Sequence, residues 1–237
     1  SAVLLIRTAS VSKTEFEESM TRVNHGLTKL TQLIKDLPTQ NIGLDVKTTK
    51  KVYALLGERD QQIILGLPSE ASKISKSFSK AEQQALSFLV RKFYCAETYH
   101  HGNYTLKLLY QYGWPDPLVF GEEAGHSVWL VFQHLDSNPD LQKQFLPILN
   151  NAVENDLAKS SWYAYLYDRV MVNSGEKQLY GTQLSGCGLK PLADPNNVNE
   201  RRLKLGMESV ESYLSWVPNC ANSDIKKALN EAKITAN

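Results

Sequence analysis

Apolar residues recur every three or four positions over most of the chain, which is the spacing of amphipathic helices. The first such segment extends from Lys13 to Leu37, where Ser12 is placed to cap the start and Pro38 to end the helix. The same spacing predicts helices over about 48–65, 79–94, 103–112, 121–135 and 208–216, and in segments that follow Pro139, Asp156, Asp194 and Ser223. The sequence therefore predicts a mainly α fold.

Glycine and proline mark where two of these helices are expected to end. Gly66 and Pro68 follow the 48–65 segment, and Gly113 with Pro115 follows the 103–112 segment. Glycine relieves the strain of a helix end, and proline prevents continuation. Ser79 is expected to cap the helix that follows it, with Gln83 close to the capping-box position.

The helix expected over 121–135 has two different faces. At 100° per residue, one face is aliphatic and aromatic, with Ala124, Val128, Val131, Phe132 and Leu135. The opposite face is mixed, with Glu122, His126, Trp129 and Gln133. This pattern predicts a helix that packs on one side and lines something on the other.

The periodicity changes after residue 169. Val170, Met171 and Val172 precede a turn at 173–175, and the segment 178–182 follows it. β-branched residues on one side of an Asn-Ser-Gly turn are typical of a short hairpin. The predicted fold is a single helical domain with one small β-hairpin near 170–183.

Composition and charge narrow the class of protein. The 237 residues are 42% hydrophobic and 22% charged, which is ordinary for a soluble globular protein. Lys and Arg number 26 against 25 Asp and Glu, a net charge of +1, so we expect neither nucleic acid nor an anionic membrane as partner. No run approaches the roughly 20 apolar residues of a membrane span.

The location in the cell stays open. The apolar stretch Ala2 to Ile6 is too short for the hydrophobic region of a secretory signal. The chain begins at Ser1 rather than at methionine, so removal of an N-terminal segment is one expectation. Both a cytoplasmic and an exported location are compatible with these observations.

Three cysteines, Cys95, Cys187 and Cys220, are too few and too scattered for a disulfide framework or a thiolate zinc site. We expect them to serve packing. Cys187 and Cys220 both lie in loop-like surroundings that contain glycine or proline, so a single bridge in an oxidising compartment is the alternative.

Polar residues gather where apolar elements end. The expected helix over 121–135 ends in Gln133 and His134 with Asp136 beyond it, and the next long helix ends in Asp168 and Arg169. The expected hairpin carries Gln178, Tyr180, Thr182 and Gln183. Burying such groups costs free energy unless each finds a partner or a ligand, so the pattern predicts a polar pocket.

These residues resemble a mainly bacterial group catalogued as a domain of unknown function. The motifs that carry the resemblance are Asp60-Gln61; Asn103 ahead of Gly113-Trp114-Pro115; Gln133-His134-x-Asp136; Leu166-x-Asp168-Arg169; Gln178-x-Tyr180-Gly181-Thr182-Gln183; and Arg201-Arg202 with Gly206. The resemblance covers Lys50 to Trp216 and implies that the separated motifs form one site. It divides the chain into an N-terminal helical extension (1–47), a family-like helical domain (48–216) and a C-terminal helix (217–237).

Two hypotheses follow from the polar residues. In the first, the protein is an enzyme that acts on a small polar or anionic substrate. Its catalytic residues are His134, as general acid or base, and Asp136 or Asp168, which orients the imidazole. Its substrate-binding residues are Gln133, Arg169, Gln178, Tyr180, Thr182, Gln183 and Arg202. In the second, the same residues form a structural polar core of a non-catalytic binding module. Solvent access to His134 and Gln183 separates the two hypotheses.

Cofactors and metals have little support in the sequence. Glu122 and His126 lie four residues apart, with His134 further on, but the spacing places no third metal ligand. No Gly-rich phosphate loop or Gly-x-Ser-x-Gly element occurs. We expect no metal and no cofactor, and His100 and His101 are expected to be exposed loop residues.

Overall fold

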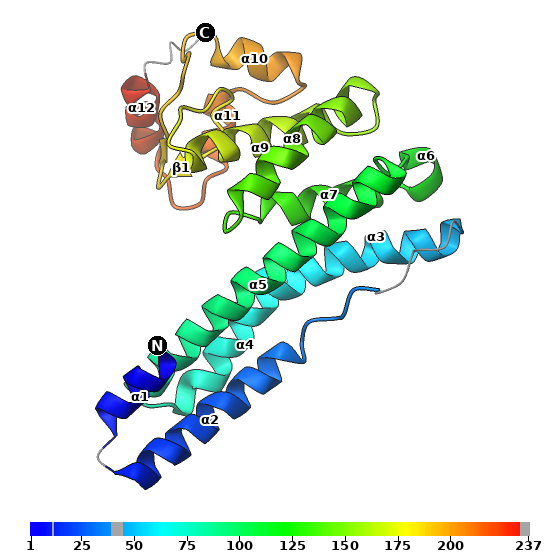
Figure 1. Ribbon diagram of the computed structural model, residues 1–237. Coiled ribbons are helices and arrows are strands. Elements are labelled where there is room, and N and C mark those ends of the chain that lie inside the picture. The colour runs from blue at the N-terminus through cyan, green and yellow to red at the C-terminus, as the bar shows by residue number, and fades with distance from the viewer. Residues whose placement is uncertain (11, 39–44, 233–237) are drawn as a thin grey trace. The chain divides into compact units, whose positions relative to one another are not determined.

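The structure is a computed structural model that describes residues 1–10, 12–38 and 45–232 (Figure 1). The described chain is mainly α-helical with one two-stranded antiparallel sheet, as predicted. It forms two compact units. Unit 1 comprises Ser1–Gln111 and Pro117–Ser137, and unit 2 comprises Tyr112–Asp116 and Asn138–Asn237.

The regular elements of unit 1, among the residues that the structure describes, are all helical. Its elements are α1 (Ala2–Ala9), α2 (Lys13–Thr31), α3 (Val46–Gln61), a π-helical turn (Gln62–Gly66), α4 (Leu67–Ile74), a 3₁₀ turn (Ser75–Ser77), α5 (Lys80–Tyr112), α6 (Pro117–Phe120) and α7 (Glu122–Gln133). The last residue of α5 belongs to unit 2. Figure 1 shows α5 as the longest helix, with α4 and α3 beside it.

The expected stop at Gly66 and Pro68 is wrong. α3 passes through the π-helical turn directly into α4, where Leu67 donates to the carbonyl of Gln62 five residues back. Pro68 then occupies the first turn of α4. A proline is tolerated there because that position needs no backbone donor.

The segments expected at 79–94 and 103–112 are parts of a single helix, α5. Its start is a capping box: the Glu82 amide donates to Ser79 Oγ at 3.3 Å, and the Ser79 amide donates to Glu82 Oε2 at 2.8 Å. Glu82, rather than Gln83, is therefore the capping-box partner. α5 ends before Gly113, whose φ of +74° suits glycine.

The core of unit 1 is built from the apolar stripes of these helices. Ile6, Val23, Leu30, Ile63 and Leu86 are at most 1% exposed and join α1, α2, the π-helical turn and α5 through one cluster. On α7, the predicted apolar face is confirmed as the buried one: Ala124, Val128, Val131, Phe132 and the following Leu135 are at most 4% exposed. This burial fixes the rotation of α7 and thereby the position of His134.

Unit 2 contains α8 (Pro139–Glu154), α9 (Ser160–Asn173), β1 (Leu184–Ser185), β2 (Gly188–Leu189), α10 (Val198–Lys204), α11 (Val210–Ser215) and α12 (Asn222–Glu231). Pro139 stands in the first turn of α8, as expected. A small apolar cluster joins the hairpin to α10, α11 and α12 through Leu192, Val198, Val210, Leu214, Ile225 and Ala228.

The position expected for the hairpin is wrong. Val170 to Asn173 continue α9, because Val170 is fully buried on the packed face of that helix. The strands lie later, with Leu184 opposite Leu189 and Ser185 opposite Gly188. The segment 178–183 forms only an isolated bridge, in which Gln178 pairs with Leu192, and its backbone N–H groups at 179, 180 and 182 donate to the side chain of Asp168 on α9.

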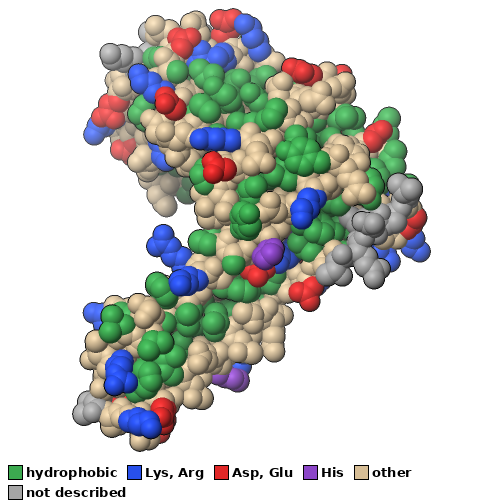
Figure 2. Space-filling view, viewed as in Figure 1, with side chains coloured by type: hydrophobic (Ala, Val, Ile, Leu, Met, Phe, Trp, Pro, Cys, Tyr) green, Lys and Arg blue, Asp and Glu red, His purple; other side chains and the backbone are tan. Residues whose placement is uncertain are grey.

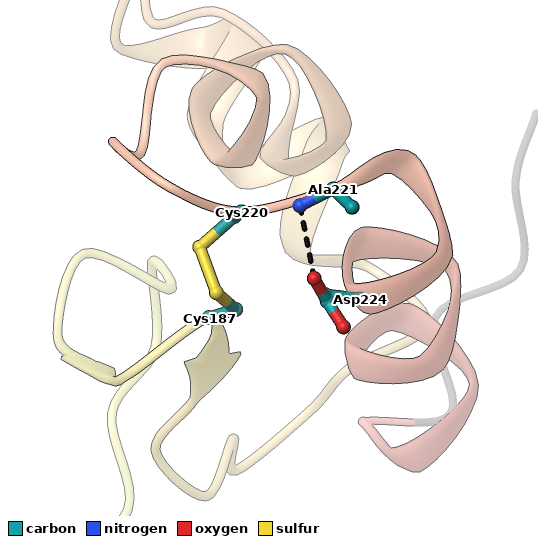
Figure 3. Close-up of a disulfide and its surroundings, with 4 residues drawn as sticks. All are labelled: Cys187, Cys220, Ala221 and Asp224. Atoms are coloured by element: carbon teal, nitrogen blue, oxygen red, sulfur yellow. Dashed lines mark hydrogen bonds between the residues drawn. A yellow bond between two sulfur atoms is a disulfide. The ribbon is translucent and has the colours of Figure 1, made fainter.

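A disulfide joins Cys187, in the turn between β1 and β2, to Cys220, just before α12 (Figure 3). The two Cα atoms are 5.6 Å apart. The packing role expected for this pair is therefore replaced by the alternative that the sequence left open. Cys95 is a free, exposed cysteine.

The surface carries charges of both signs. Figure 2 shows Lys and Arg side chains interspersed with Asp and Glu on the face in view. In the part of the chain that the structure describes, no helix is long and apolar enough to cross a membrane.

Candidate functional site

The ten residues predicted for the site fall into two groups, one in each unit. Gln133, His134 and Asp136 belong to unit 1. Unit 2 holds the remaining seven, Asp168, Arg169, Gln178, Tyr180, Thr182, Gln183 and Arg202. Their gathering around one pocket stays a prediction.

In unit 1, His134 pairs with a carboxylate that the sequence had not assigned to it. The residue ends α7, and its Nδ1 lies 3.1 Å from Oδ1 and 2.9 Å from Oδ2 of Asp60 on α3. Asp60 is 3% exposed, whereas the imidazole is 28% exposed. Gln61 donates from Nε2 to the same carboxylate at 2.9 Å. The pair is thus anchored on the buried side and open to water on the other.

The Asp60 carboxylate determines where the neutral imidazole holds its proton. A carboxylate only accepts hydrogen bonds, so Nδ1 of His134 carries the hydrogen and Nε2 keeps a lone pair. Among the described residues, Nε2 has no hydrogen-bond partner. An imidazole oriented in this way can accept a proton at Nε2 and return it.

The orienting role proposed for Asp136 is filled at Nδ1 by Asp60. Asp136 is exposed in the turn beyond α7. Gln133 is 6% exposed, and its Oε1 has no hydrogen-bond partner. Asp60 was visible in the sequence only as half of an Asp-Gln motif, and nothing in its spacing pointed to His134.

A second buried charge lies one residue before Asp60. Arg59 is 5% exposed; its Nε donates to the Lys35 carbonyl at 2.9 Å, and its Nη2 pairs with Glu97 on α5. In the sequence this arginine stands in a Glu-Arg-Asp run that reads as an ordinary solvated surface. Only the packing of α3 against α5 buries it.

The expectation for His101 is wrong. His100 and His101 lie within α5 rather than in a loop, and His101 is 2% exposed. Burial, together with the nearby Arg59 charge, lowers the pKa of His101 to about 3. The imidazole of His101 is therefore neutral at physiological pH.

In unit 2, Asp168 organises the segment 179–182. It is fully buried, and its Oδ1 accepts the backbone N–H groups of Leu179 at 2.8 Å and Tyr180 at 3.0 Å. Oδ2 accepts the N–H of Thr182 at 2.9 Å and its hydroxyl at 3.0 Å. Gly181 between them has a φ of +67°, which suits glycine and turns the Thr182 N–H toward the carboxylate.

Burial raises the pKa of Asp168, and the hydrogen bonds from the three backbone N–H groups partly oppose that shift. With four donors already bound, the carboxylate is engaged in holding this loop. Its geometry is that of a structural anchor.

Gln178 is the second fully buried anchor of this segment. Its Nε2 donates to the carbonyls of Gln183 at 2.9 Å and Lys190 at 2.7 Å. Its Oε1 accepts the Gln183 amide at 2.8 Å. Gln183 itself is partly exposed, and its side chain donates to the Thr182 hydroxyl at 3.2 Å.

Arg202 on α10 closes the network from the other side. It is fully buried, and donates to the carbonyls of Glu208 at 2.6 Å and Tyr180 at 2.8 Å. Its guanidinium carbon lies 5.0 Å from the ring centre of Tyr213, whose hydroxyl donates to the Thr182 carbonyl at 3.1 Å. Burial raises the pKa of Tyr213 to about 12.

Two of the predicted residues of unit 2 remain partly accessible besides Gln183. Arg169, near the end of α9, and Tyr180 are each partly exposed, and the Tyr180 ring meets that of Tyr167 edge-on at 6.0 Å between centroids. A cavity of about 420 Å³ also lies in unit 2, lined by Lys177, Leu189, Lys190, Pro191, Leu192, Ala193, Pro195, Ala228, Glu231 and Ala232. None of the ten predicted residues lines it.

Among the side chains that the structure describes, no group of three or more His, Cys, Asp and Glu residues is arranged to hold a metal ion.

Comparison with known protein families places the chain. Residues 97–226 match the family of unknown function DUF6624, which is more than half of the 237 residues. The chain belongs to this family. The DUF6624 match begins later than the resemblance suggested, so His134 and the unit 2 network lie inside it, whereas Arg59 and Asp60 lie outside. No curated protein and no solved structure matched the chain.

Proposed function

We propose that the protein is an enzyme that acts on a small polar substrate by acid–base chemistry, with His134 as the proton-exchanging group. One observation carries the proposal. The imidazole of His134 is held through Nδ1 by the buried carboxylate of Asp60, while the ring keeps 28% exposure. A ring that is oriented on its buried side and accessible at Nε2 can exchange a proton with a bound substrate.

Asp60 is the positioning residue in this proposal. It fixes the tautomer and the ring orientation of His134, and it stabilises the imidazolium that forms when Nε2 takes a proton. Gln61 supports Asp60 from its other side. Gln133 and Asp136 flank the imidazole and are candidates for substrate contact.

The residues of unit 2 divide into two roles. Asp168, Gln178, Thr182 and Arg202 act as scaffold, because each is at most 4% exposed and bonded to the backbone or side chains of its own unit. Arg169, Tyr180 and Gln183 are the candidates for contact with a ligand. The acid–base chemistry of the enzyme hypothesis thus concerns unit 1, and the structural polar core of the binding-module hypothesis concerns unit 2.

The test compares the hydrolysis of p-nitrophenyl acetate and p-nitrophenyl phosphate by wild type and variants. Loss of a general acid–base group lowers the rate about 10²–10⁴-fold, so His134→Gln should lose that factor in kcat/KM on the ester that is turned over. His25→Gln is the matched control, since His25 is exposed on α2. Equal rates for wild type and His134→Gln on both esters would contradict the proposal.

A second measurement needs no substrate. Nitrogen chemical shifts of the imidazoles distinguish the two neutral tautomers, and His134 should carry its hydrogen on Nδ1. Asp60→Leu should remove that preference while His25 stays unchanged. A His134 that already carries its hydrogen on Nε2 in the wild type would remove the basis of the mechanism.

A further inference from the structure

Arg59 on α3 and His101 on α5 are connected through Glu97 in unit 1. The guanidinium of Arg59 pairs through Nη2 with Glu97. Glu97 and His101 are four residues apart on α5 and therefore share one face of that helix. The electrostatic effect of Arg59 on His101 agrees with this placement.

Each of the two side chains has a buried nitrogen without a hydrogen-bond partner. These are Nη1 of Arg59 and Nε2 of His101, in residues that are 5% and 2% exposed. The other nitrogens of the guanidinium are engaged: Nε with the Lys35 carbonyl and Nη2 with Glu97. Buried polar groups ordinarily have a partner, so two adjacent exceptions indicate a place where one binds.

Charge decides what kind of group fits. Glu97 already neutralises Arg59, and His101 is uncharged at physiological pH because of its burial. An anion bound at Nη1 would be repelled by the Glu97 carboxylate, whereas an uncharged oxygen would meet only the donor.

We propose that Arg59 and His101 form an internal binding site for a small uncharged ligand, a primary carboxamide. Nη1 of Arg59 donates to the carbonyl oxygen, and Nε2 of His101 accepts an N–H of the same amide. Glu97, which is 20% exposed, forms the side of this site that reaches solvent. The binding of the amide by Arg59 and His101 does not depend on the proposed function. Only its use as a substrate of His134 rests on that function.

The test is a titration with acetamide, followed by the backbone amide signals of α5 around residue 101. We expect saturable shifts in the wild type. Arg59→Lys keeps the ion pair with Glu97 but removes Nη1, and His101→Phe keeps a ring of similar size but removes Nε2. Loss of one hydrogen bond corresponds to about three- to tenfold weaker binding, and each variant should show at least that loss.

A charge variant tests the selectivity. Acetate has the shape of acetamide and should bind the wild type more weakly, while Glu97→Gln should reverse that order by leaving Arg59 uncompensated. His134→Gln should leave acetamide binding intact, so this site and the acid–base proposal can fail separately. Three results would each overturn the site. These are no saturable shift with acetamide, acetamide binding in Arg59→Lys and His101→Phe that equals that of wild type, or a wild type that binds acetate more tightly than acetamide.

Discussion

The disulfide between Cys187 and Cys220 gives the sharpest prediction for stability. Replacing both cysteines by serine removes the bond and changes little in side-chain size. Cys220 directly precedes α12, whose first turn is capped by a hydrogen bond from the Ala221 amide to Asp224 Oδ2 at 2.9 Å (Figure 3). α12 has only 10 residues, so it depends on tertiary contacts to persist.

The magnitude follows from the length of chain that the bond closes. The cysteines are 33 residues apart, and closing a loop of that size lowers the entropy of the unfolded chain enough to stabilise the fold by about 3–4 kcal/mol at 25 °C. Ile225 and Ala228 anchor α12 in the apolar cluster of unit 2. That small cluster has little capacity to replace the lost constraint.

The assay is urea unfolding of the double variant under oxidising conditions. Tryptophan fluorescence reports mainly on unit 2, because Trp114, Trp162 and Trp216 belong to it and only Trp129 belongs to unit 1. We expect the free energy of unfolding to fall by about 3–4 kcal/mol. Wild type treated with a reductant should match the variant, and Cys95→Ser should behave as oxidised wild type.

Two results would refute this reasoning. One is an oxidised wild type whose peptides show free thiols at Cys187 and Cys220. The other is a double variant that unfolds at the wild-type urea concentration and retains wild-type hydrogen-exchange protection in α12. Either result would mean that the packing of α12, rather than the bond, determines the stability of this part of the fold.

Two further predictions concern the buried polar groups. Asp168→Asn places an amide NH₂ against backbone N–H donors whose hydrogen bonds the carboxylate accepts in the wild type. The free energy of unfolding, measured by urea denaturation, should therefore fall by about 2–4 kcal/mol. A fall of less than about 0.5 kcal/mol, the size of an ordinary surface substitution, would contradict the role of anchor. His101 has a folded-state pKa of about 3 against an ordinary 6.5, so the unfolded state binds the extra proton and stability present above pH 6.5 is lost as the pH falls toward 3. This loss amounts to roughly 3 kcal/mol between pH 7 and pH 4. The free energy of unfolding of His101→Gln should therefore depend less steeply on pH than that of wild type or of the His25→Gln control. Identical slopes in the three proteins would refute the assignment.

Much of the helical architecture could be predicted from local patterns. Spacing and helix ends are set by residues within about one turn of one another, so the start of α2 at Ser12, α7 and the stop at Gly113 were recognisable in the sequence. The end expected for α2 at Pro38 was wrong, because the helix already ends at Thr31. The buried face of α7 was also predictable, since one row of apolar residues permits only one rotation against a core. Predictions failed where a local signal met a longer-range contact, as at Pro68 after the π-helical turn and at Val170, which the core of unit 2 keeps helical.

The candidate site depended far more on tertiary structure. The sequence identified His134 as a candidate for acid–base chemistry, but Asp60, its partner, lies 74 residues away. His101 was expected to be an exposed loop residue, yet it is buried within α5, and nothing in the sequence indicated that Arg59 is buried. Asp168 was predicted to be catalytic and Arg202 to bind substrate, yet their hydrogen bonds go to the loop 179–182 and to Glu208.

The sequence alone thus determined the helical class, the apolar faces and the residue types available for chemistry, because side-chain periodicity and helix capping are local properties. Tertiary structure decided which of those polar residues have partners, which are sealed and which keep a free nitrogen. Burial and hydrogen bonding depend on segments that meet only after the chain has folded, and the same histidine or carboxylate serves as scaffold or as reactive group according to what it meets there.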